Sequence, residues 1–159
     1  DSSNLMDTFE QVGQLMKEIG SQLNLGAVVE YEDLQSWTLF IDEKSALSVD
    51  VDFDTRKLIL SAELPPQPEE RRAAAYELLL LVNGEWAETG GLRMGLEEPD
   101  GSILMQYDQT LPGLDNQELE TVLRSFISQM EYWVKALEGQ IEEPEELVEE
   151  PLPMEAMRI

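Results

Sequence analysis

Acidic side chains are the first candidates for chemistry in this sequence. Residues 50–54 read DVDFD, and such alternating carboxylates are typical of the start of a calcium-binding EF-hand loop. That loop also needs a glycine at its sixth position and a glutamate at its twelfth, but Thr55 and Ser61 stand there instead. Val51 and Phe53 alternate with the aspartates as in a β-strand. We therefore expect these acids on a solvated face of a sheet, and the sequence predicts no metal site.

The composition excludes several kinds of catalytic site. The 159 residues include no His and no Cys, which removes thiol catalysis, disulfides, the usual zinc ligands and histidine general bases. Gly90 and Gly91 are followed by Leu-Arg-Met, so they do not begin a phosphate-binding loop. With 34 Asp+Glu, the closeness of two carboxylates in the sequence carries no information. We expect no enzyme and no cofactor. An enzyme that uses carboxylates stays an alternative, and it would require a concave site with perturbed acids.

The net charge of −24 limits the classes of partner. Phosphate backbones and anionic membrane surfaces repel such a chain, so we expect neither nucleic acid nor membrane as a partner. No apolar run approaches the roughly 18 residues that a membrane-spanning helix needs. The first residues show no signal peptide, and the lack of Cys is compatible with the cytoplasm.

Three helices are expected from apolar residues that recur three and four positions apart. The first helix covers residues 4–25, and the second covers residues 69–88 after a proline-rich break. The third helix follows Asp115, a capping residue, and ends near Leu137.

Strands are expected where apolar and polar residues alternate. This alternation predicts three antiparallel strands within residues 35–63 and a hairpin at residues 92–96 and 103–107. The expected fold is therefore an α+β domain over residues 1–137, in the order α-β-β-β-α-β-β-α, with a twisted antiparallel sheet packed by helices. Residues 138–159 carry eight acids, one base and three prolines, so we expect a flexible acidic tail there.

The second helix carries apolar residues on nearly all of its sides, so it must be covered all round. We expect a second copy of the chain to complete the cover, which makes the protein a homodimer. The alternative is a central helix wrapped by its own domain. The residues predicted for the dimer interface are Tyr76, Leu79, Leu80, Val82 and Trp86.

Further apolar residues lie on the first helix and on a strand that is apolar on both faces. Methionine side chains adapt to varied partners, so a surface for binding peptides is expected there. The alternative is that these residues only fill the core. The residues predicted for partner contact are Met6, Leu15, Met16, Trp37, Leu39 and Phe40.

The sequence resembles a known family, the Tir chaperone (CesT-like) family of small acidic class I chaperones of bacterial type III secretion. The resemblance covers residues 8–137 and rests on the order of elements together with several diffuse segments. These segments are WTLFID at 37–42, LILSAELP at 58–65, residues 78–83, ETGG at 88–91, LRMGL at 92–96 and the closing helix with Phe126, Tyr132 and Trp133.

The resemblance implies a homodimer without ATPase activity in the bacterial cytoplasm. Such a protein holds the N-terminal chaperone-binding segment of one or several secreted effectors extended and competent for secretion. The secretion ATPase or a regulator is a further partner to consider. The alternative function is a regulatory binding protein that sequesters a secretion regulator through its acidic surface or tail. The acidic extension after residue 137 and two glycines in the first helix depart from the family pattern.

Overall fold

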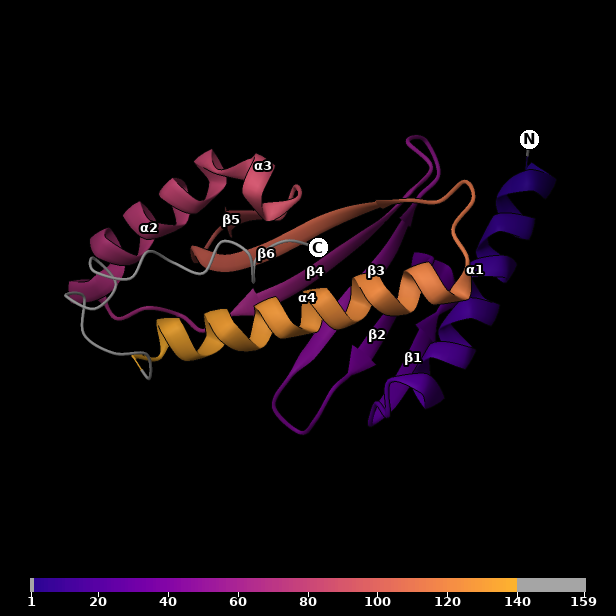
Figure 1. Cartoon of the computed structure of the whole chain (residues 1–159), viewed down its shortest axis with the longest axis horizontal. Helices are drawn as coiled ribbons and strands as arrows, with labels where there is room; N and C mark the ends of the chain where they lie inside the picture. Colours follow the sequence, from indigo (N-terminus) through magenta and orange to yellow (C-terminus); the bar gives the residue numbers. More distant parts are fainter. Residues whose placement is uncertain (1, 140–159) are drawn as a thin grey trace. The chain divides into compact units, whose positions relative to one another are not determined.

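The computed structural model describes residues 2–139, apart from the side chains of residues 2–7 and of Trp86 (Figure 1). The chain forms two compact units. The first unit contains the chain up to Ala62 together with Asp108–Arg124, and the second contains Glu63–Tyr107 together with the chain from Ser125. The predicted tail begins at Glu138, so nearly all of it lies outside the described residues.

The described elements bear out the α+β class with an antiparallel sheet. The six strands are ordered β1-β2-β3-β4-β6-β5, and the pairs β1–β2, β2–β3, β3–β4 and β5–β6 are antiparallel. The elements are α1 (Ser2–Gln22), β1 (Ala27–Tyr31), the 3₁₀ helix η1 (Glu32–Leu34), β2 (Ser36–Phe40), β3 (Ala46–Asp52), β4 (Lys57–Leu64), α2 (Glu69–Gly84), α3 (Trp86–Thr89), β5 (Arg93–Glu97), β6 (Ser102–Thr110) and α4 (Asn116–Leu137).

Three elements, β1, η1 and α3, were not expected from the sequence. The predicted order of elements lacks β1, which lies at one edge of the sheet and pairs with β2. The predicted second helix also runs too far, because α2 ends at Gly84 and the backbone N–H of Glu85 turns back to the carbonyl of Val82. The residues after this turn form the separate short helix α3.

The core of the first unit lies between α1 and the sheet. Val12, Met16 and Ile19 recur along one face of α1 and are almost fully buried. The ring of Phe9 stacks on the ring of Trp37, with 4.8 Å between the ring centroids and 21° between the planes. The alternating residues of the strands complete this core: Leu39, Leu47, Val49, Leu58 and Leu60.

The two glycines of α1 let this helix approach β1 closely. A Cβ atom at Gly13 would lie 3.2 Å from Glu30 Oε1, and one at Gly20 would lie 3.2 Å from Val28 Cγ2. The helix itself is weakened by glycine, by roughly 1 kcal/mol per residue relative to alanine. The contact with β1 therefore explains both glycines, which the sequence alone left as a departure from the family pattern.

In the second unit, α2 covers the edge strand β5. The side-chain amide of Asn83 donates to the carbonyl of Met94 and accepts from its backbone N–H, both at 2.8 Å. One face of α2 is buried through Ala75, Leu79 and Val82. The amide of Asn83 thus takes the place of a neighbouring strand at this sheet edge.

The carboxylates of residues 50–54 differ in their burial and in their hydrogen bonds. The Asp52 carboxylate accepts hydrogen bonds from the backbone N–H groups of Asp54 and Thr55 in the turn between β3 and β4. Asp50 is half-buried on β3. Among residues 2–139, no group of three or more acids is placed to hold a metal ion. No helix in this described part of the chain is long and apolar enough to cross a membrane.

Candidate protein-binding surfaces

An apolar groove of the second unit lies between α2 and β5. This α2 groove has a volume of about 260 Å³. Leu80 and Leu96 line it with exposed fractions of 71% and 51%, and Leu81, the next residue of α2, is 63% exposed. Large apolar side chains with this exposure mark an interaction surface when they cluster. The residues that line the α2 groove are Tyr76, Leu79, Leu80, Asn83, Met94, Gly95 and Leu96.

The residues predicted for a dimer interface divide into three groups. Leu80 is exposed and Tyr76 is half-buried, and both line the α2 groove. Leu79 and Val82 are buried within their own unit, at 4% and 1% exposure. The side chain of Trp86 lies outside the described residues. Leu80 and Leu81 are so exposed that the alternative of a helix wrapped by its own domain is wrong for the described chain.

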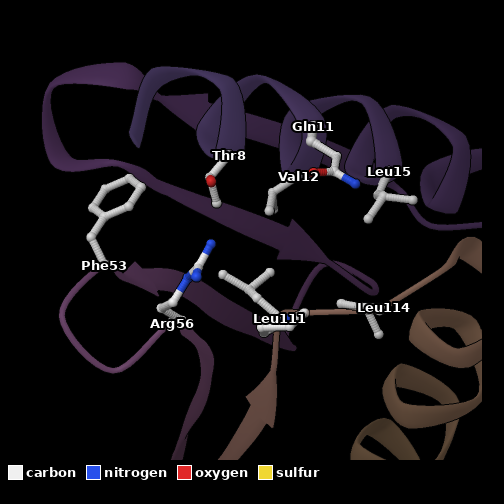
Figure 2. Close-up of a pocket in the computed structure, with 10 residues that line it drawn as sticks. Thr8, Gln11, Val12, Leu15, Phe53, Arg56, Leu111 and Leu114 are labelled. Carbon is white, nitrogen blue, oxygen red and sulfur yellow. The ribbon is translucent and has the colours of Figure 1, made fainter. Parts of the chain in front are cut away.

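A second hollow, the α1 groove, lies in the first unit between α1, the β3–β4 turn and the segment before α4 (Figure 2). It has a volume of about 220 Å³. Figure 2 shows Leu15 and Leu114 at the end of the groove away from the turn, and Leu111 between them and Arg56. The residues that line the α1 groove are Thr8, Gln11, Val12, Leu15, Phe53, Arg56, Leu111, Pro112, Gly113 and Leu114.

Arg56 brings the one positive charge to the lining of the α1 groove. Figure 2 shows its side chain pointing from the sheet toward α1, in the direction of Thr8. The segment that carries Leu111 is fixed beside it, because the backbone N–H of Leu111 donates to the carbonyl of Arg56 at 3.0 Å. No periodic pattern in the sequence singles out an arginine in a turn, so neither Arg56 nor Phe53 was among the predicted contact residues.

The residues predicted for partner contact are not brought together on one surface. Leu15 is half-buried and lines the α1 groove, and Phe40 is 37% exposed on β2. Met16, Trp37 and Leu39 are covered by their own unit, at 0%, 1% and 0% exposure. Met6 has its backbone in α1, but its side chain lies outside the described residues. The role of these residues in binding stays a prediction, and only Leu15 and Phe40 offer surface to a partner.

A third hollow of about 550 Å³ lies where α1 passes over β1. Gly13 and Gly20 form part of its wall, together with Met16 and Trp37. One of its polar residues is Glu30, whose carboxylate accepts a hydrogen bond from Trp37 Nε1 at 3.1 Å. The carboxylate is therefore engaged in holding the tryptophan ring in the core.

The acids with shifted pKa values do not line either apolar groove. Backbone and side-chain hydrogen bonds hold the pKa values of Asp42, Asp52 and Asp100 below their ordinary value. Burial raises the pKa of Asp50. None of these four residues lines the α1 groove or the α2 groove. Neither groove therefore combines a cleft with the perturbed acids that a carboxylate enzyme would require.

Comparison with known proteins assigns the chain to a family. The profile of the Tir chaperone protein (CesT) family matches residues 14–134. The chain belongs to this family. The match includes the C-terminal part of α1, the whole sheet and nearly all of α4, so the resemblance predicted from the sequence is confirmed. No protein in a search of curated sequences matches the chain.

Several solved structures have a similar fold. A chain from the HopA1–SchA chaperone–effector complex has a TM-score of 0.65 and 21% identity, over 85% of this chain and 98% of that one. A chain from the ExsC–ExsE complex has a TM-score of 0.67 and 18% identity, over 80% and 94%. The Yersinia pestis chaperone SycH, solved with a fragment of YscM2, has a TM-score of 0.56 and 18% identity, over 76% and 97%.

Proposed function

We propose that this Tir chaperone family member binds the N-terminal segment of one or more type III secreted effectors in the bacterial cytoplasm, without ATP. Family membership is the observation that carries the proposal. The HopA1–SchA structure, a chaperone–effector complex, supports it for a protein of the same fold. The α1 groove adds support, because it offers leucine and phenylalanine side chains to a partner.

The physical basis of the proposed activity is the burial of apolar anchors from an unfolded segment. Such a segment loses conformational entropy when it is ordered, and many contacts along its length must offset that loss. Each large apolar side chain that becomes fully buried contributes about 1.5–3 kcal/mol. Binding of this kind needs no nucleotide hydrolysis. The net charge of −24 keeps a chain with exposed apolar grooves in solution.

The proposal includes a homodimer in which a second copy covers the α2 groove. Leu80, Leu81 and Leu96 lose most of their exposed area in such an arrangement. We estimate that burial of each leucine stabilises the dimer by about 1–2 kcal/mol, since each side chain is already partly covered. A two-fold axis between the copies would bring the same leucines from both, which doubles their number. The α1 groove belongs to the other unit.

The test is co-purification with the N-terminal segments of candidate secreted proteins. The full chain is co-expressed with the first hundred or so residues of each substrate of the neighbouring secretion system. We expect a stable complex with at least one segment, and Leu15→Asp and Leu111→Asp should weaken it. Lys44→Asp, in the exposed turn between β2 and β3, is the control and should not weaken it. Failure with every substrate would contradict the proposal.

A second candidate function is the sequestration of a secretion regulator through acidic surface, and the net charge of −24 favours it. Complexes of opposite charge form faster and lose affinity with salt. Removal of residues 138–159 separates the two functions. Loss of all binding favours the regulatory protein, whereas retained binding favours the chaperone that works through its apolar grooves.

A further inference from the structure

The charge of the α1 groove differs from the charge of the whole chain. Acids make up 34 of the 159 residues, yet none of the ten residues that line the groove is an acid. The lining instead contains Arg56, one of only ten Lys+Arg in the chain. At physiological ionic strength, charges farther away than about 8 Å are largely screened. The lining of the groove itself therefore carries one positive charge and no negative charge toward a segment bound in it.

Arg56 has no acidic partner among the described residues, unlike neighbouring cations of the same unit. Lys57 lies 3.9 Å from the carboxylate of Asp108, and Arg124 lies 3.3 Å from that of Glu120. The guanidinium of Arg56 is exposed and points into the groove (Figure 2). A guanidinium group binds a carboxylate through two parallel hydrogen bonds, which gives both affinity and orientation.

The fold does not need an arginine at this position. The backbone of Arg56 has a φ of 57°, in the left-handed region that favours glycine and asparagine. An asparagine would suit this turn between β3 and β4 better than an arginine does. The backbone conformation thus does not account for an arginine at this position. The position of its side chain in the groove offers an explanation.

We infer that Arg56 selects partner segments in which an aspartate or glutamate stands close to a large apolar residue. The apolar residue enters the groove beside Leu15, Leu111 and Leu114, and the carboxylate pairs with Arg56. This inference rests on the proposed function, because it assumes that the α1 groove receives an extended segment of another protein. Charge complementarity carries the choice of occupant.

The first test uses a displayed library of random peptides, selected separately on the purified full chain and on three variants. On the wild-type chain, we expect enrichment of large apolar residues with a neighbouring Asp or Glu. Arg56→Asn should still enrich apolar residues but should no longer enrich Asp or Glu. Arg56→Glu should enrich Lys or Arg in place of Asp or Glu. Lys44→Asn is the matched control, because it removes a cation from another turn of the same unit, and it should select like wild type.

The second test measures affinity with one selected acidic peptide and with the same peptide carrying Asn or Gln in place of the acid. On the wild-type chain, we expect the acidic peptide to bind roughly three- to tenfold more tightly than the amide peptide. On Arg56→Asn, the two peptides should bind alike. Thermal unfolding of Arg56→Asn should occur at or above the wild-type temperature, which excludes misfolding as the cause.

The outcomes separate this inference from the proposed function. If both wild type and Arg56→Asn enrich apolar residues, and select acidic residues at the same frequency, then the proposed chaperone function is retained but the role of Arg56 is wrong. No enrichment of either kind contradicts both. If Arg56→Asn binds the amide peptide much more tightly than wild type does, then a segment of this chain itself occupies the groove through Arg56, and the assignment to a partner segment is wrong.

Discussion

Single carboxylates in this chain act on stability in opposite directions. The hydrogen bond from the Lys44 backbone to Asp42 and those from Thr55 to Asp52 hold both pKa values below the ordinary 3.8. Their contribution to stability is fully present above that ordinary value and is lost as the pH falls through the lower folded-state value. Asp50 behaves in the opposite way, because burial disfavours its charged form and raises its pKa.

Asp50→Asn should stabilise the protein at neutral pH. The charged side chain costs stability wherever the pH is above its raised folded-state pKa, and this cost disappears as the pH falls toward the ordinary 3.8. Urea denaturation at pH 7 should therefore show a higher midpoint for the variant, and the difference should shrink in acid. An equal difference at both pH values would mean that packing between Ser36 and Ile59, rather than charge, causes the change.

Asp115→Ala should cost about 1 kcal/mol in the free energy of unfolding. The Asp115 carboxylate accepts a hydrogen bond of 2.8 Å from the backbone N–H of Glu118 in the first turn of α4. Gln117→Ala is the control, because this side chain is exposed in the same turn and should change stability by less than about 0.5 kcal/mol. Equal effects in urea denaturation would show that the cap is unimportant.

At the scale of elements, the packing of α1 on β1 depends on small residues. Gly20→Val should destabilise the protein by about 1–3 kcal/mol, because the new side chain meets Val28 across a gap already filled. Ser21→Val is the matched control on the exposed side of the same helix, and it introduces the same β-branched residue without that contact. Chemical denaturation distinguishes them. Similar losses for both would mean that a β-branched side chain on this helix, not the approach of α1 to β1, lowers the stability.

The regular elements could be predicted because one face of each is buried. The alternation around Trp37 and Val49 and the helical spacing from Leu119 to Leu137 are produced by burial against a core. Residues 27–31 lack this signal, since the edge strand β1 has no fully buried side chain. The end of α2 was placed too late, because the residues on both sides of the break at Glu85 favour a helix about equally.

The candidate site was less predictable than the fold, because apolar character does not tell which side of an element faces outward. Met16, Trp37 and Leu39 were expected to contact a partner but fill the core. Arg56 and Leu111 are far apart in the sequence, and only the fold brings them to one groove. A lone side chain in a turn has no periodicity from which its role could be inferred.

At the scale of the whole molecule, the exposed leucines predict an assembly of two copies. Light scattering of the wild-type chain should give about 36 kDa, twice the 18.0 kDa of one chain. Leu80→Arg should reduce this mass to that of one chain at micromolar concentration, because it places a charge in the apolar α2 groove.

Leu34→Arg is the matched control for this change in mass. Leu34 is as exposed as Leu80, at 72% against 71%, but it lies in η1 of the other unit. The Leu34→Arg variant should keep the mass of the homodimer. A wild-type chain that stays at 18.0 kDa, or an equal effect of both substitutions, would contradict an assembly through α2.

Buried Gln67 joins the end of α4 to the beginning of α2, because its side-chain amide donates to the carbonyl of Leu137 at 3.0 Å. A dye attached just after Leu137 therefore sits at the foot of α2, about 16 Å along that helix from Leu80. Because the natural sequence has no Cys, one introduced at Glu138 would be the sole thiol for labelling. Fluorescence energy transfer between donor-labelled and acceptor-labelled copies could then follow their exchange in real time, without touching either groove.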